Sequence, residues 1–246
     1  MPRFKDQAIC IRHIDWSETS QVVVLLTQEH GKLRGLAKGS KRQSPSSVQR
    51  FSGGIELLTL GQVVAVTRPT AELATLTEWD LQNDYHHLRC DFHAQRLAMY
   101  AADLCHALLA DEDPHPGAFE AMSCFLEALR DREQHALALL HFQWALLTDC
   151  GYRPELERDV RLGSELKAEK AYTFDPIAGG LTNENGIADW RVRRRTVELL
   201  RTLAKGEPLT GADHETIDRA NRLLCVYARS ILDKELPTMR CVLNGG

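Results

Sequence analysis

The first group of candidate functional residues in this sequence is a set of charged side chains between Gly31 and Arg50. This stretch holds six basic residues and no acidic one; the basic residues are Lys32, Arg34, Lys38, Lys41, Arg42 and Arg50. Its first half alternates as a β-strand does, and Gly, Ser and Pro interrupt its second half as they do in a loop. A basic strand that continues into a basic loop is typical of surfaces that bind nucleic-acid phosphates. We therefore predict that these six residues bind nucleic acid.

Two aromatic residues near this stretch, Trp16 and Phe51, are candidates for stacking on bases. Each could instead fill the core of the fold, and that alternative suits Phe51 better.

A second basic cluster follows residue 190 and contains Arg191, Arg193, Arg194, Arg195 and Arg201. On a helix, Arg191, Arg194, Arg195 and Arg201 would share roughly one side and could contact DNA a second time. Glu198 lies on the same side, and this favours an ordinary solvated helix face. Both interpretations stay open.

Enzyme chemistry has little support in the motifs. His86, His87, Cys90, Asp91 and His93 lie close in sequence, and one helical turn could present two of them to a metal, as in a metal-dependent hydrolase. No second ligand pair with matching spacing follows, and GxSxG, HExxH and the phosphate-loop motif are missing from the sequence. We predict no catalytic activity, no cofactor and no metal.

Composition predicts a cytoplasmic protein without membrane contact, and the predicted nucleic-acid binding would associate it with the nucleoid. The 246 residues have a net charge of −4 and an apolar fraction of 43%, as in soluble globular proteins. Residues 1–80 carry ten basic and eight acidic side chains, whereas the remainder carries twenty and twenty-six. The seven cysteines are widely spaced and form no CxxC, which indicates free thiols in a reducing compartment. The N-terminal sequence lacks a signal-peptide pattern.

The hydrophobic patterns predict a multidomain chain, β first and then α. Residues 7–80 contain short β-like runs at 7–12, 21–27, 32–38, 55–60, 62–68 and 73–79, which favour a small closed barrel. The basic face makes the oligonucleotide-binding (OB) fold the best match. Apolar residues then recur at helical spacing, and helices are expected from 92, 116, 136, 189 and 213.

These patterns predict four segments. Residues 1–80 form the OB-fold domain, 81–153 the first part of a helical bundle domain, 154–188 a small irregular insert with one short hairpin, and 189–246 the second part of the bundle domain.

Several segments resemble the RecO family of bacterial recombination mediators. The N-terminal signature comprises Trp16-Ser17-Glu18-Thr19-Ser20, Thr27-Gln28-Glu29-His30-Gly31-Lys32 and Leu36-Ala37-Lys38-Gly39-Ser40-Lys41-Arg42. Further on, Phe174-Asp175-Pro176-Ile177-Ala178-Gly179-Gly180-Leu181 is similar to the family's FDPxxGGL segment.

The resemblance implies an OB fold followed by a helical domain with a small inserted subdomain. It implies binding of single- and double-stranded DNA, annealing of complementary strands, and partnership with RecR and the C-terminal tail of single-stranded DNA-binding protein. The implied role is loading of RecA onto DNA during repair. The family's DNA-contacting positions fall on Arg34, Lys38, Lys41 and Arg42.

The insert departs from the family pattern. Many RecO proteins carry two CxxC pairs there, but Asp159 and Leu162 stand at the first pair and no cysteine follows Leu181 in the insert. Thiolate ligation of zinc is therefore ruled out in this segment. We expect the insert to be held by side-chain packing alone.

One alternative function remains open. The chain could be a protein-interaction scaffold of a repair complex with little DNA affinity of its own, as its acidic helical part would suit. The purified protein would then show no salt-sensitive affinity for single-stranded oligonucleotides.

Overall fold

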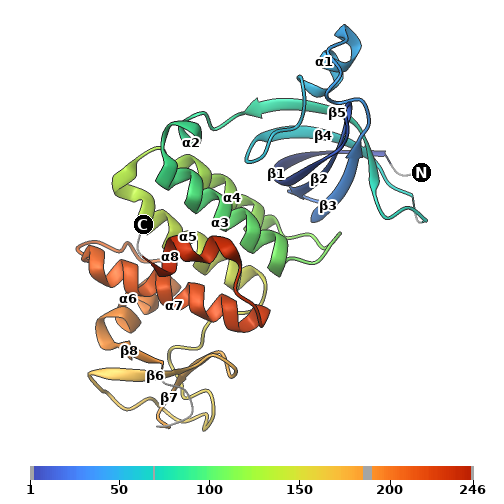
Figure 1. The fold of residues 1–246 in the computed structure, drawn as a ribbon. Coiled ribbons are helices and arrows are strands. Elements are labelled where there is room, and N and C mark those ends of the chain that lie inside the picture. Colours follow the sequence, from blue (N-terminus) through green and yellow to red (C-terminus); the bar gives the residue numbers. More distant parts are fainter. Residues whose placement is uncertain (1–2, 69, 185–189, 245–246) are drawn as a thin grey trace. The chain divides into compact units, whose positions relative to one another are not determined.

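The computed structural model describes residues 3–68, 70–184 and 190–244, which belong to two compact units, residues 1–130 and 131–246 (Figure 1). Residues 81–130, assigned by the sequence pattern to the helical domain, are compact with the barrel. Within the described ranges no helix is both long and apolar enough to cross a membrane.

The first unit contains five strands and four helices among its described residues. The strands are β1 (Arg3–Ser17), β2 (Ser20–Thr27), β3 (Lys32–Ala37), β4 (Leu60–Val66) and β5 (Ala74–Asn83). The helices are α1 (Pro45–Phe51), α2 (His87–Cys90), α3 (Phe92–Leu108) and α4 (Pro116–Ala128).

The five strands close into a barrel in the order β1-β2-β3-β5-β4, with β4 pairing back on β1. Only the β3–β5 pairing is parallel. Alternate apolar residues such as Val23, Leu25 and Leu33 fill the barrel, and Trp79 is its largest side chain. The predicted OB-type barrel is confirmed.

Two local predictions in this unit are wrong. The run predicted at residues 55–60 is not a strand of its own: only Leu60 is in a strand, β4, because Gly53 and Gly54 turn the chain at positive φ and the side-chain amide of Gln21 satisfies both the N–H and the C=O of Ile55. The predicted loop up to Arg50 contains α1 instead. Ser44 caps this helix, and a proline occupies its first turn.

The turn between β2 and β3 is fixed by side chains. The Thr27 hydroxyl donates to the carbonyl of Gly31 at 2.7 Å, and the Asp6 carboxylate accepts from the backbone N–H groups of Glu29 and His30. Gly31 has φ +71°, and a Cβ at this position would overlap the backbone of Asp113. Only glycine meets both conditions.

The turn places Lys32 against the end of α3. Its Nζ donates to the carbonyls of His106 at 2.8 Å and Leu109 at 2.6 Å, and lies 3.1 Å from the Asp111 carboxylate. These carbonyls belong to the helix C-terminus, where a cation is favoured. Since the Lys32 side chain is only 8% exposed, Lys32 cannot bind nucleic acid as predicted.

The second unit combines helices with a small sheet. Its helices are α5 (His135–Asp149), α6 (Arg194–Ala204), α7 (His214–Leu232) and α8 (Arg240–Leu243), with 3-10 turns at Arg132–Gln134 and Pro237–Met239. Helix α5 packs on α7 through a buried hydrogen bond of 2.9 Å between Gln143 and Asn221.

The insert is more regular than predicted. Its three-stranded sheet contains β6 (Ala171–Asp175), β7 (Gly180–Thr182) and β8 (Arg191–Arg193), with β6 in the middle. The helix expected from residue 189 therefore begins only at Arg194; residues 185–189 lie outside the described residues.

Buried carboxylates also hold the insert, so packing alone is not the explanation. Asp159 is 1% exposed and accepts hydrogen bonds from the backbone N–H groups of Arg161, Leu162 and Asn183 and from the Thr182 hydroxyl. These bonds join the turn after residue 159 to the end of β7.

A second turn repeats this geometry. The Asp175 carboxylate accepts from the backbone N–H groups of Ile177 and Ala178, and the Arg161 guanidinium lies 2.5 Å from it. Both turns have the spacing Asp-x-x-x-Gly and close with a backbone hydrogen bond from the glycine to the aspartate carbonyl. Arg161 joins the two turns.

Replacing the Lys32 ammonium should weaken the first unit. In Lys32→Met, three acceptors at the end of α3 lose their donor, and the free energy of unfolding should fall by about 1–3 kcal/mol. Urea denaturation followed by circular dichroism measures the change. The exposed Lys5→Met is the matched control, expected within about 0.5 kcal/mol of wild type. Equal stability of the two variants would contradict the structural role of Lys32.

Asp159 should make the insert sensitive to acid. Burial would raise the pKa of the Asp159 carboxyl, but hydrogen bonds from Asn183, Leu162, Arg161 and Thr182 outweigh it and lower the pKa below its usual value. Because the folded-state pKa lies below the unfolded one, this stabilisation is complete above about pH 4 and is lost as the pH falls through the folded-state pKa.

The variant that tests these hydrogen bonds is Asp159→Asn. Its side-chain N–H₂ would face the backbone N–H donors and could not accept from them. We expect a loss of about 1–3 kcal/mol at pH 7 and a weaker dependence of stability on acid, measured by urea denaturation at several pH values. Glu165→Gln, an exposed change in the same insert, is the control. An Asp159→Asn protein with wild-type stability would show that these hydrogen bonds do not hold the insert.

Candidate nucleic-acid interface

Three predicted residues present exposed charges on β3 and in the segment that follows it. Arg34 lies on β3 on the side opposite the core, Lys38 directly follows the strand, and Arg42 lies in the next loop. Among the residues that the structure describes, none of these three has an acidic partner within ion-pair distance. Their charges are therefore available to phosphate groups.

The loop that carries Arg42 rests on the hairpin of β1 and β2. The backbone N–H of Lys41 donates to the carbonyl of Thr19 at 3.2 Å, and Gly39 donates to the Ser20 hydroxyl. These bonds hold the basic loop beside the hairpin tip.

Lys41 and Arg50 are exposed but already engaged. The Lys41 ammonium lies 2.6 Å from the Asp15 carboxylate, and this bond lowers the pKa of Asp15. Arg50, on α1, donates to the carbonyl of Ser46 and lies 5.7 Å from the centre of the Phe51 ring. Both can still reach solvent, so they remain predicted DNA ligands.

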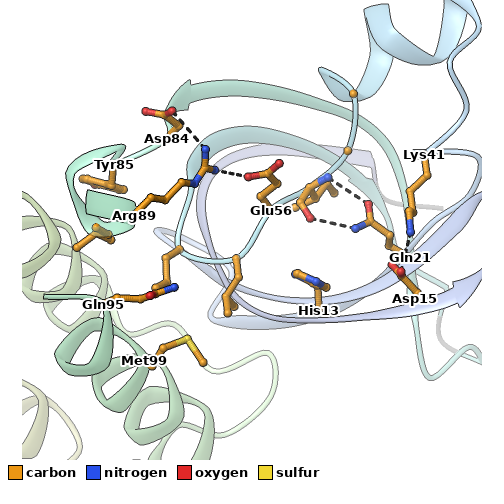
Figure 2. Close-up of a pocket in the computed structure, with 16 residues that line it drawn as sticks. His13, Asp15, Gln21, Lys41, Glu56, Asp84, Tyr85, Arg89, Gln95 and Met99 are labelled. Atoms are coloured by element: carbon orange, nitrogen blue, oxygen red, sulfur yellow. Dashed lines mark hydrogen bonds and ion pairs between the residues drawn. The ribbon is translucent and has the colours of Figure 1, made fainter. Parts of the chain in front are cut away.

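A pocket of about 420 Å³ lies beside this charged region (Figure 2). Figure 2 shows Arg89 between Glu56 and Asp84, and Lys41 directed at Asp15. Three carboxylates thus offset its cations, so the pocket itself does not suit a phosphate chain.

The two aromatic candidates for base stacking differ in their exposure to solvent. Phe51 is 1% exposed and belongs to the barrel core, so it cannot stack on a base, whereas Trp16 is 70% exposed. Sequence alone did not distinguish their environments beyond favouring a core position for Phe51.

The second basic cluster does not form one helix face. Arg191 lies on β8, where it donates to Ala171 and Thr173. Arg194 begins α6 and donates to Glu198 at 2.7 Å. Arg195 lines a different pocket, which also includes Asp213. The prediction that Arg191, Arg194 and Arg195 share one side of a helix is wrong, because the helix expected from residue 189 begins only at Arg194 and leaves Arg191 on β8.

A groove of about 350 Å³ lies between β8 and helices α6 and α7. Trp190, Val192, Leu223 and Val226 supply apolar surface, and the basic residues that line it are Arg191, Arg193, Arg219 and Arg222. The hydroxyl of Thr196, also in the lining, is buried and finds no hydrogen-bond partner among the residues that the structure describes.

Sequence reasoning missed Arg219 and Arg222. They are three residues apart on α7 and therefore lie on the same side of that helix, which is the one signal that could have indicated them. Their position in the same groove as the arginines of β8 depends on the tertiary fold.

In the metal-like cluster after residue 85, Cys90 Sγ lies 3.7 Å from His86 Nε2, but other members are engaged elsewhere. His87 Nε2 lies 2.8 Å from the carbonyl of Leu126, and Asp91 caps the N-terminus of α3. Across residues 3–68, 70–184 and 190–244, no group of three or more His, Cys, Asp or Glu side chains could hold a metal ion.

Two family models match the chain. Residues 1–85 match "Recombination protein O N terminal" and residues 89–240 match "Recombination protein O C terminal". The boundary between them lies just after the last barrel strand.

Curated relatives agree with the models. A DNA repair protein RecO of Anaeromyxobacter sp. strain K is 32% identical over 180 residues, which cover 73% of this chain and 69% of that protein. The corresponding protein of Rhodopirellula baltica is 30% identical and covers 72% and 65%. That of Dehalococcoides mccartyi is 29% identical and covers 74% and 69%. Since the matches extend over the barrel, the helices and the insert, this chain belongs to the RecO family of DNA repair proteins.

Proposed function

We propose that this RecO-family protein is a non-enzymatic mediator that binds single- and double-stranded DNA and anneals complementary strands. The observation that carries the proposal is a set of three exposed cations, Arg34, Lys38 and Arg42, on and after β3 of an OB-type barrel, for which the described residues supply no acidic partner. Lys41 and Arg50 extend the set. Family membership supports the same role in DNA repair.

Annealing needs no covalent step. Two strands repel each other through their phosphates, and cations that neutralise phosphates on both strands lower this repulsion. Base pairing then supplies the driving force. A surface of exposed Lys and Arg side chains therefore suffices.

The arginine-lined groove suits a protein partner. Four guanidinium groups around an apolar lining match a peptide that is acidic and ends in an aromatic residue. We assign this groove to the C-terminal tail of single-stranded DNA-binding protein. With RecR, the protein would help load RecA onto DNA coated by that partner.

The DNA-binding assignment predicts a loss of annealing in Lys38→Ala/Arg42→Ala. This variant loses two unpaired phosphate ligands, so the annealing rate of complementary oligonucleotides should fall at least tenfold in a fluorescence-quenching assay. The control is Lys5→Ala/Arg68→Ala, which removes two exposed charges elsewhere on the barrel. Wild-type annealing by the first variant would refute the assignment.

Salt dependence separates this proposal from the scaffold alternative. If four or five cations contact phosphates, the affinity for single strands should fall with a log–log salt slope of about −3. The slope should become less steep by about 1.4 in the double variant, since each lost contact removes about 0.7. A wild-type protein that binds no oligonucleotide at any salt concentration would favour the scaffold.

The groove assignment predicts that Arg193→Ala/Arg222→Ala weakens binding of an acidic, Phe-ended peptide by at least tenfold. Charge-assisted hydrogen bonds to the peptide carboxylates are lost in this variant. Fluorescence anisotropy of a labelled peptide measures the effect. Arg194→Ala/Arg195→Ala is the control, because these residues lie outside the groove lining. Equal weakening in both variants would indicate a non-specific charge effect.

A further inference from the structure

One face of the barrel outside the basic loop is formed by matched positions on β1, β2 and β3. Arg12 pairs with Val24, which pairs with Arg34, and one step along the barrel Ile14 pairs with Val22, which pairs with Leu36. The core-facing residues of β2 are Val23 and Leu25, so these matched positions face outward.

Helix α3 covers only one end of this face. There Ile9 and Leu26 are fully buried, and Lys32 bonds to the helix C-terminus. Toward the hairpin tip the cover ends, and Ile14 is 59% exposed. Trp16, two residues further along β1 at a bulge beside the turn, is 70% exposed. Two large apolar side chains exposed so close together on one strand are a candidate interaction site.

Cations border these apolar side chains. Arg12 and Arg34 lie on the side toward α3, Lys38 lies on the side toward the hairpin tip, and all three are exposed. No acidic residue occupies the matched outward positions. We call Arg12, Ile14, Trp16, Arg34, Leu36 and Lys38 the Trp16 patch.

A single-stranded nucleic acid fits this combination best. Its bases offer flat apolar faces that stack on aromatic side chains, and its phosphates bind the surrounding cations. In a duplex the base faces are already stacked on one another and are inaccessible. A wholly apolar partner would leave the three cations unpaired.

We propose that the Trp16 patch binds unpaired bases by stacking on Trp16, and that this stacking makes the protein bind single strands more tightly than duplex. This inference rests on the proposed DNA-binding function. The cations contribute equally to both kinds of DNA, whereas the indole ring contributes only where a base is free. Single-strand selectivity thus resides on β1, separate from the basic loop.

The test is Trp16→Ala, assayed by anisotropy with a labelled oligo(dT) and a labelled duplex of equal length. Affinity for oligo(dT) should fall about 5- to 100-fold, while duplex affinity and the salt slope stay unchanged. Trp16→Phe should retain most of the affinity, because a phenyl ring still stacks. Oligo(dT) should also quench tryptophan emission in the wild type and not in Trp16→Phe.

Phe92→Ala is the matched control, since Phe92 on α3 is 74% exposed and lies outside the Trp16 patch. Its affinities should equal those of the wild type. A wild-type protein that binds neither DNA would overturn the proposed function itself. Wild-type binding of oligo(dT) with no effect of Trp16→Ala would overturn only the Trp16 patch. Equal loss for single strand and duplex would also overturn stacking as the source of selectivity.

Discussion

The buried ammonium of Lys32 fixes the relation between the barrel and the helices that follow it in the first unit. Removing a charge from water is unfavourable, and the folded chain offsets this with two helix-terminal carbonyls and the Asp111 carboxylate. All three acceptors lie more than seventy residues away in sequence. The start of β3 is therefore fixed by the end of α3, and the barrel strand cannot shift in register without breaking these bonds.

This constraint also separates structural from functional cations on one strand. Lys32 and Arg34 point to the same side of β3, and Lys38 follows the strand. Helix α3 covers only the first position. Distance from the helix, rather than the face of the strand, thus determines which cation supports the fold and which can meet a phosphate.

Sequence patterns predicted the structural features that are determined by residues close together in the chain. The β-rich first part, the helices from Phe92, Pro116 and residue 136, and the OB type of the barrel all followed from periodicity and local charge. Local signals also existed for α1, since Ser44 and Pro45 form a regular helix start. The burial of Lys32 had no such signal, because a basic residue in an alternating strand is normally exposed.

Long-range pairing explains the remaining differences. Isoleucine is a residue type that favours strands, yet the backbone N–H and C=O of Ile55 bond to the Gln21 side chain instead of to another strand. The arginine-lined groove joins residues of β8 and α7 that are almost thirty positions apart. Neither arrangement is visible in a window of neighbouring residues.

The two Asp-x-x-x-Gly turns hold the insert through carboxylates, so its structure depends neither on zinc nor on reduced cysteines, as a thiolate site would. No cysteine occurs between Cys150 and Cys225, and the carboxylates of Asp159 and Asp175 perform the joining role within the sheet. Carboxylates do not react with peroxide, as thiolates do. They also need no zinc, for which a thiolate site would compete with the other thiols of the cell. Peroxide that would oxidise thiolate ligands would therefore leave the groups that join this sheet of a DNA repair protein unchanged.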